Sequence, residues 1–197
     1  MATIVARLGE RLEAIGLGLG AVRELDVLGA LRGELGELAL GGDAGQSELQ
    51  VLGLDRLFGL SAGLEQGGAN VFLVQTMGPL HGISGGTPGA LGLHGSSASG
   101  VALALDTIGL EQADRALFHE LGHQLGLFHT TERDGSTLEP LRDTPTCGLD
   151  QDLNSDGVLR ASECAAHDAD NLMFWEAGGD ALSAEQVAIL TRSALLR

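Results

Sequence analysis

The segment of residues 119–129 constrains the fold of this chain more than any other stretch. It reads H-E-L-G-H-Q-L-G-L-F-H, and its first two histidines are four positions apart, so they share one face of an α-helix. Gly126 follows and can end the helix, because glycine adopts a positive φ without steric cost. The chain can then turn back and bring His129 to the same place. The segment therefore predicts a helix with a sharp exit and three imidazoles around one point.

Three neutral imidazoles that leave one position open are the ligand set of a catalytic zinc ion rather than a structural one. We therefore expect His119, His123 and His129 to bind zinc, and Glu120, beside the first ligand, to act as the general base. Zinc lowers the pKa of water toward about 7 and polarises a carbonyl, while the carboxylate accepts a proton and passes it to the leaving amine. The alternative is a helix with unrelated histidines, but three of the six histidines fall within this segment at ligand spacing.

The motif resembles that of the metzincin zinc metalloproteases. The longer string HELGHQLGLFHTTE at residues 119–132, followed by D-T-P at residues 143–145, resembles the pappalysin-like branch of that family. The resemblance covers about residues 101–192. It implies that residues 1–197 form a single α/β catalytic domain, with a twisted mixed sheet, an active-site helix and a C-terminal helix around a cleft.

Metzincins also carry a methionine turn beneath the metal, downstream of the third histidine. Met173, within N-L-M-F-W at residues 171–175, fits that role; without the upstream motif, a methionine here would indicate only a filler of the core. Many metzincins place a tyrosine just after this methionine, as a further ligand or an oxyanion stabiliser. This chain contains no tyrosine, and Phe174 and Trp175 occupy the region instead. Transition-state stabilisation is then expected from zinc, a backbone amide or another side chain.

The resemblance implies a zinc-dependent endopeptidase that hydrolyses peptide bonds in a protein or peptide substrate. Three other classes are compatible with the motif: an inactive zinc- and calcium-binding relative that serves as an interaction module, a zinc hydrolase of a non-peptide amide, and a protease with a glutamate as third ligand. The intact Glu120 favours an active enzyme, whereas the missing tyrosine favours the inactive relative.

Thr130 stands where some branches carry an aspartate, and with Glu132 it is expected to fix the chain after His129. Specificity, natural substrate, latency and oligomeric state are left open.

A second metal motif lies between the two cysteines. Residues 152–163 read D-L-N-S-D-G-V-L-R-A-S-E and match the D-x-[DN]-x-[DN]-G-x5-E pattern of an EF-hand calcium loop. The expected calcium ligands are Asp152, Asn154, Asp156, the carbonyl of Val158, and Glu163. Gly157 supplies the sharp turn. We expect a structural calcium ion that stiffens an insertion at about residues 147–164; the alternative is an acidic surface loop that binds nothing.

The chain has two cysteines, Cys147 and Cys164, and both flank a polar loop rather than lie in an apolar run. This favours a disulfide, which would close a loop of about 18 residues and stabilise the fold by roughly 3 kcal/mol; two reduced, buried thiols are the alternative. A disulfide implies an oxidising compartment, so the chain is expected to be secreted or otherwise extracytoplasmic. Residues 1–18 are interrupted by charges and are typical of an amphipathic helix, not of a signal peptide.

Length and composition favour one domain and argue against two kinds of partner. With 197 residues, 44% of them hydrophobic, the chain can bury a sizeable core, and because only 3% are aromatic we expect Leu, Ala, Val and Ile to build it. A net charge of −16 argues against binding to nucleic acid, whose phosphates it would repel. The chain has no run of about 18 apolar residues, so no membrane span is predicted.

Hydrophobic periodicity and turn residues predict a mixture of helices and strands. Helices are expected over residues 3–15, 47–60, 111–125 and 183–195. Strands are expected over residues 17–28, 71–74 and 101–105, and loops over residues 29–46 and 78–100. Ser183 is the expected N-cap of the last helix.

The longer, Gly/Ser-rich loop contains two further histidines, His81 and His94. A loop histidine is usually a polar surface residue, and a catalytic or second-metal role for either one is the alternative.

Metzincins bind extended substrate along an antiparallel edge strand of the sheet. Residues 70–77 and 100–105 are both candidates for that strand.

Overall fold

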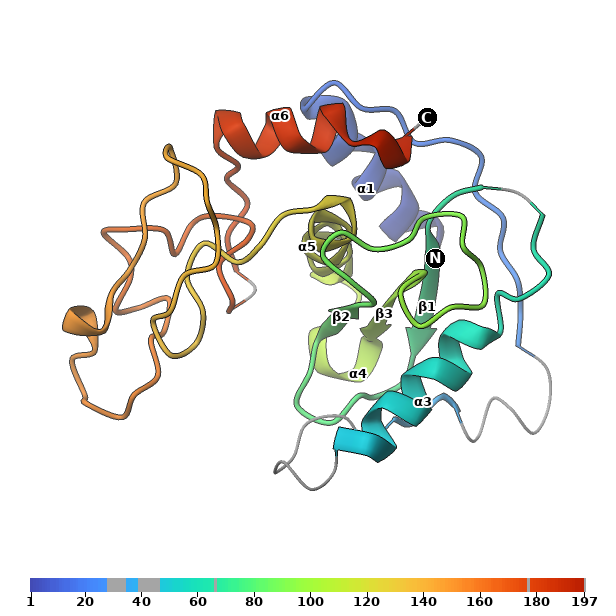
Figure 1. The fold of residues 1–197 in the computed structure, drawn as a ribbon, viewed down its shortest axis with the longest axis horizontal. Helices are drawn as coiled ribbons and strands as arrows, with labels where there is room; N and C mark the ends of the chain where they lie inside the picture. Colours follow the sequence, from blue (N-terminus) through green and yellow to red (C-terminus); the bar gives the residue numbers. More distant parts are fainter. Residues whose placement is uncertain (28–34, 39–46, 66, 177, 197) are drawn as a thin grey trace.

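A three-stranded mixed sheet lies at the centre of the computed structural model, which describes residues 1–27, 35–38, 47–65, 67–176 and 178–196 (Figure 1). In this part of the chain the strands are β1 (Asn70–Val74), β2 (Gly82–Ser84) and β3 (Gly100–Ala104). The five α-helices of the same part are α1 (Ala2–Ala14), α3 (Ser47–Gly59), α4 (Leu105–Ile108), α5 (Ala113–Leu125) and α6 (Ala184–Arg192). The expected mixed class, with both helices and strands, is confirmed.

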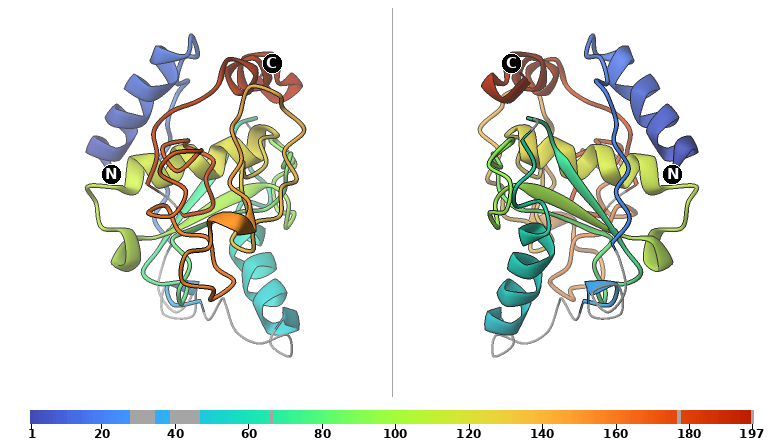
Figure 2. Two further views of the ribbon diagram at one scale, coloured as in Figure 1. Left: turned by 90° about the vertical axis from the view of Figure 1, so that its left-hand side faces the viewer. Right: turned by 90° about the vertical axis from the view of Figure 1, so that its right-hand side faces the viewer.

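Strand β3 organises the sheet, because it pairs with both neighbours. It runs parallel to β1 and antiparallel to β2, and all of its residues are buried. Its alternating side chains divide the core: Val101 and Leu103 pack with α1, α5 and α6, whereas Ala102 and Ala104 pack with the end of α3. Figures 1 and 2 show α5 and α3 on opposite faces of the sheet.

Helix α5, which carries the histidine motif, lies across one face of the sheet and contacts β2, β3 and α1. Leu117 and Leu125 are buried on its core side. Gly126 ends the helix with a φ of 112°, and the amide of the following Leu127 donates back to the carbonyl of Gly122. Glycine accepts this left-handed ending without strain, and the ending turns the chain back toward the helix.

One of the expected strands is absent from the structure. Residues 17–27, which make up all but the last residue of the predicted strand 17–28, form no strand. Glycines alternate with leucines at its start, and glycine weakens a strand because it has no side chain to pack. Strand β1 lies where residues 71–74 predict it, but only Val74 is buried, because β1 is an edge of the sheet. Most of the predicted loop 29–46 lies outside the described residues.

The antiparallel edge strand is in neither of the two candidate segments, 70–77 and 100–105. Strand β2 takes this position, inside residues 78–100, for which the sequence predicts only a loop. A strand of three residues that begins with glycine has no readable periodicity. A residue of another element holds the strand in place: Ser84 Oγ donates to Oε1 of the fully buried Gln124 of α5 at 2.7 Å.

The segment between α5 and α6 has little regular structure and stands beside the sheet (Figure 1). A disulfide joins Cys147 and Cys164, which confirms the predicted bridge. Helix α6 begins after Ser183, which confirms the predicted N-cap, and the Ser183 side chain accepts a hydrogen bond from the amide of Gln186 in a capping box. Within the described ranges, no helix is long and apolar enough to cross a membrane.

Helix α1 is held against the start of α5 by a buried carboxylate. Arg11 Nε donates to Asp114 Oδ2 at 2.7 Å, and the same guanidinium contacts Asp180 at 2.6 Å. Asp114 is only 3% exposed, and Arg115 makes a further contact to Asp180 at 3.0 Å. The network therefore joins α1, α5 and the loop before α6 at one point.

Replacing Arg11 with methionine is expected to lower the free energy of unfolding by about 2 kcal/mol, because Asp114 would stay buried without its main partner. The loss is smaller than the roughly 3–5 kcal/mol of a fully buried pair, since Arg11 is partly exposed. Arg23→Met, at an exposed position, is the matched control. Urea unfolding of the three proteins measures the difference. A loss for Arg11→Met no larger than that of Arg23→Met would contradict this role.

Candidate metal centre

The three histidines of the motif meet at one point. His119 and His123 extend from successive turns of α5, and His129 returns to them after the Gly126 turn. The Nε2 atom of His129 lies 3.2 Å from that of His119 and 3.0 Å from that of His123. Two nitrogens bound to one tetrahedral zinc ion at about 2.0–2.1 Å stand about 3.3 Å apart. The spacing therefore suits a single metal ion.

The opposite nitrogen of each ring is held by a hydrogen bond. In each ring Nδ1 donates to an oxygen: His119 to the carbonyl of Leu172 (2.6 Å), His123 to the carbonyl of Leu127 (2.7 Å) and His129 to the carboxylate of Glu132 (3.0 Å). These oxygens can only accept, so each Nδ1 carries a proton, and in a neutral ring the Nε2 atom then keeps its lone pair. Three lone pairs that face one another repel unless a cation lies between them, so the donor set fits a metal ion.

Burial keeps the two imidazoles of α5 neutral. Together with the neighbouring rings of the set, it lowers the pKa of His119 to about 3 and that of His123 to about 4. Both rings are therefore unprotonated at neutral pH and able to bind a metal. Imidazole suits zinc, copper, iron and nickel alike, so the described atoms define a metal site without naming its metal.

Glu120 follows the first histidine and is buried at the edge of the same site. Burial raises the pKa of its carboxyl to about 8, and within the described residues no hydrogen-bond partner reaches it. Strand β2 covers the carboxyl: a Cβ atom on Gly82 would lie 2.6 Å from Glu120 Oε1, so this glycine leaves the space that the side chain occupies. A cation held by the histidines would favour the ionised form of Glu120.

Met173 lies under the histidine helix. It is fully buried, and a Cβ atom on Gly122 would lie 2.7 Å from its sulfur, so the glycine inside the motif lets the two segments approach. The Met173 carbonyl accepts a hydrogen bond from the amide of Thr130 at 3.0 Å. Its neighbour Leu172 supplies the carbonyl that orients the first ring. The turn thus binds the ring of His119 and the backbone of Thr130, the residue after His129.

A cleft of 650 Å³ opens over the three histidines and Glu120. Residues of β2 line it on the side of the sheet. The other side belongs to residues that follow the helix, among them Phe128, Leu138, Trp175 and Glu176. The site is therefore open to a molecule larger than water.

Neither aromatic residue after Met173 offers an atom that could bind the metal. Phe174 is fully buried. Trp175 lines the cleft, but its indole Nε1 donates to the carbonyl of Leu159 at 2.6 Å. The two residues that stand in the region of the absent tyrosine are thus engaged elsewhere.

The two loop histidines lie in different places. His81 is exposed and lines the cleft, directly before Gly82. His94 contacts Asn70 of β1, with 2.9 Å between His94 Nδ1 and Asn70 Nδ2. Of the two, only His81 lines the cleft.

The predicted calcium loop is folded at the surface beside the disulfide. Its polar side chains accept hydrogen bonds from backbone amides of the loop: Asp152 from Gly157, Asn154 from Asp156, Asp156 from Val158, and Glu163 from Leu153. The Arg160 guanidinium lies 2.8 Å from Asp156 Oδ2. Asp152 Oδ1 is buried and has no hydrogen-bond partner among the described residues. Among the described residues, the carboxylates of Asp152, Asp156 and Glu163 do not come close enough together to form a metal-binding group.

Sequence reasoning points to Glu132 but misses other residues that shape the site. Gly82 is one of 31 glycines, and only its contact with Glu120 gives it a role. The carbonyls of Leu127 and Leu172 orient two rings, yet any residue type could supply a carbonyl. No signal in the sequence singles these three positions out.

Comparison of the chain with known proteins adds no relative. A scan against protein-family models, a search of curated proteins and a search of solved structures each found no match. The residues of the site and their geometry are therefore what indicates a function for this chain.

Replacing Glu132 with glutamine is expected to weaken zinc binding about 10- to 100-fold, because the carboxylate orients the third ring and makes it a stronger ligand. Glu13→Gln, at an exposed position of α1, is the control. Competition for zinc between each protein and a chelating dye measures the affinity. Equal affinities of the two variants would show that this carboxylate does not support the site.

Proposed function

We propose that the chain is a zinc-dependent endopeptidase with a catalytic domain of the metzincin type. The convergence of three imidazole Nε2 atoms beside a buried glutamate, in an open cleft, carries this proposal. Two further observations support it: the antiparallel edge strand β2 borders the cleft, and Met173 lies under the histidine helix. An edge strand offers backbone groups with which an extended peptide can pair.

Each part of the site has its own task in peptide hydrolysis. Zinc, when bound, would polarise the scissile carbonyl and activate a water molecule. His119, His123 and His129 hold the ion and leave room beside it for solvent and substrate. Glu120, whose carboxylate is not engaged elsewhere, accepts the proton of the attacking water and passes it to the leaving amine.

The arrangement also limits what can stabilise the oxyanion. Phe174 has no donor, and the indole of Trp175 is bound to a backbone carbonyl. A metal ion, when bound, would supply part of this stabilisation, and we assign the remainder to a backbone amide at the cleft or to the side chain of His81.

The compartment follows from the disulfide. Cys147 and Cys164 are joined, and disulfides form and persist in oxidising environments. We therefore propose that the protein works outside the cytoplasm.

Glu120→Gln is expected to lower cleavage of an unfolded protein substrate by at least about 100-fold, because an amide cannot accept the proton. Its zinc content is expected to stay at one ion per chain, since the three ligands are intact. Glu111→Gln, an exposed position just before α5, is the matched control. Release of labelled peptides and metal analysis of the same samples give the two readouts.

The outcomes separate the proposed enzyme from its alternatives. Cleavage that disappears in Glu120→Gln and persists in Glu111→Gln supports the endopeptidase. Equal cleavage by all three proteins would assign the activity to another protein in the sample. No cleavage by the zinc-loaded wild type would contradict the proposal and favour an inactive relative that serves as an interaction module.

We propose in addition that residues 152–163 bind a structural calcium ion. Carboxylate and carbonyl oxygens are the ligands that calcium prefers, and residues 152–163 carry them at the spacing of an EF-hand loop. The unpartnered oxygen of Asp152 is a further acceptor for a cation. Calcium would replace the Arg160 guanidinium as the positive charge beside Asp156.

Calcium at about 1 mM is expected to raise the melting temperature by roughly 3–8 °C, the effect of a dissociation constant near 10⁻⁵–10⁻⁴ M on a chain of this size. The shift is expected to disappear in Asp156→Ala and to remain in Asp55→Ala, an exposed aspartate of α3. Thermal unfolding followed by circular dichroism measures it. An unchanged melting temperature, or a shift that survives in Asp156→Ala, would contradict calcium binding at this loop.

A further inference from the structure

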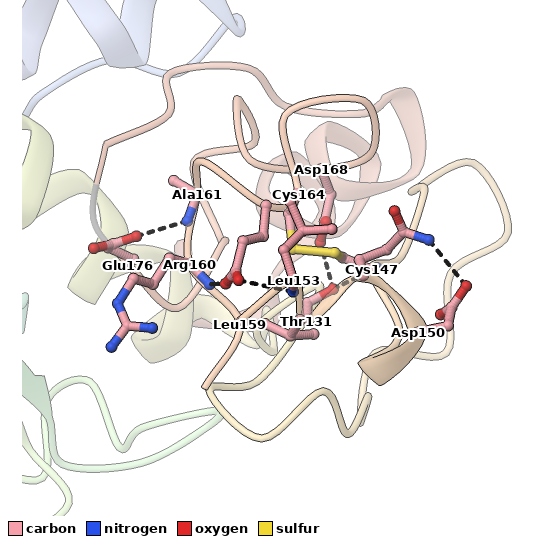
Figure 3. The surroundings of a disulfide bond; sticks show 12 residues. Thr131, Cys147, Asp150, Leu153, Leu159, Arg160, Ala161, Cys164, Asp168 and Glu176 are labelled. Atoms are coloured by element: carbon pink, nitrogen blue, oxygen red, sulfur yellow. Dashed lines mark hydrogen bonds between the residues drawn. A yellow bond between two sulfur atoms is a disulfide. The ribbon is translucent and has the colours of Figure 1, made fainter. Parts of the chain in front are cut away.

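The disulfide-closed segment, residues 147–164, contacts the cleft wall through two backbone groups. The carbonyl of Leu159 accepts the indole hydrogen of Trp175 at 2.6 Å, and the amide of Ala161 donates to Glu176 Oε2 at 2.7 Å. Figure 3 shows the second of these bonds together with the disulfide. Trp175 and Glu176 both line the cleft. Backbone groups of the segment therefore hold two side chains that line the cleft.

The same segment is anchored to the chain that follows the third histidine. The amide of Cys147 donates to Thr131 Oγ1 at 2.9 Å, and that hydroxyl donates to the buried Asp168 at 2.7 Å. The amide of Leu159 donates to the carbonyl of Arg133 at 2.9 Å. Leu159 thus bridges two parts of the site, because its amide binds one and its carbonyl binds the other.

The disulfide is the centre of the small buried cluster that contains Leu159. Cys147, Cys164, Leu159 and Phe174 are all buried and pack together. Apart from the 3-10 turn Leu149–Gln151, the segment contains no helix or strand. Opening the disulfide would restore conformational freedom to a loop that no ladder of hydrogen bonds holds in place.

We propose that the disulfide-closed segment is a positioning element of the substrate cleft: through Leu159 and Ala161 it sets where Trp175 and Glu176 stand, and thereby how tightly substrate binds. The proposal rests on the proposed function, because it concerns the cleft of the same site. The oxygens that orient the three metal-binding rings all belong to residues outside this segment. Opening the disulfide is therefore expected to change the wall and to leave the metal centre in place.

Trp175 is the single tryptophan of the chain, so its fluorescence reports on this wall directly. In Cys147→Ala/Cys164→Ala we expect emission at longer wavelength and stronger quenching by acrylamide than in the wild type, with one zinc ion still bound. Leu153→Ala is the control, because this side chain lies in the same segment and is 82% exposed. Emission and quenching equal to those of the wild type would overturn the proposal.

Kinetics of substrate cleavage test the second half of the proposal. The loss of one or two hydrogen bonds behind the wall is expected to raise KM roughly 3- to 10-fold in the double cysteine variant, while kcat changes by less than about twofold. A fall in kcat at unchanged KM would overturn the role in substrate binding. Absence of cleavage by the zinc-loaded wild type would instead overturn the proposed function, and fluorescence would still decide whether the segment positions the wall.

Two variants with the disulfide intact keep the proposal testable if the double cysteine variant does not fold. Glu176→Gln retains an oxygen that accepts the amide hydrogen of Ala161, whereas Glu176→Ala does not. We expect Glu176→Ala to raise KM and to shift the emission of the adjacent Trp175, and Glu176→Gln to resemble the wild type. Equal behaviour of Glu176→Ala and the wild type, or equal defects in both variants, would overturn it.

Discussion

The hydrogen bonds at the three Nδ1 atoms set the orientation of the imidazoles, and the candidate metal centre depends on this orientation. Each Nδ1 is bound to an oxygen, so the three Nε2 atoms point to the same place, where a metal ion could bind them together. Two of the three oxygens are backbone carbonyls, of Leu127 and Leu172. The metal centre therefore depends on the path of the backbone as much as on the histidines themselves.

Several distant elements fix that path. Gly126 reverses the chain after α5, and Gly122 lets Met173 approach the helix closely enough for its segment to bind the His119 ring and the backbone amide of Thr130. Strand β2 covers Glu120 and deprives its carboxyl of water, which raises its pKa. Burying a carboxyl and opposing three lone pairs are both unfavourable without a cation. A bound metal ion would relieve both, so metal binding and stability are coupled in this account.

The sequence predicts those parts of the site that one local element supplies, and misses those that depend on remote contacts. Spacing within a single helix places two histidines on one face, and the exit at Gly126 follows from glycine chemistry. Strand β2 has no local signal, because its position depends on β3 and on Gln124. Residues 17–27 show the reverse, an alternating pattern without a partner strand. The hydrogen bond from Trp175 to the carbonyl of Leu159 could not be predicted from the sequence either, because any residue type supplies a backbone carbonyl.

X-ray absorption at the zinc edge of the metal-loaded protein tests the central claim most directly. The account predicts three imidazole nitrogens and at least one light-atom ligand at about 2.0–2.1 Å, with no sulfur. His129→Ala is expected to remove one imidazole from that shell. Two or fewer imidazoles in the wild type, or a sulfur ligand near about 2.3 Å, would contradict a metal centre built from His119, His123 and His129.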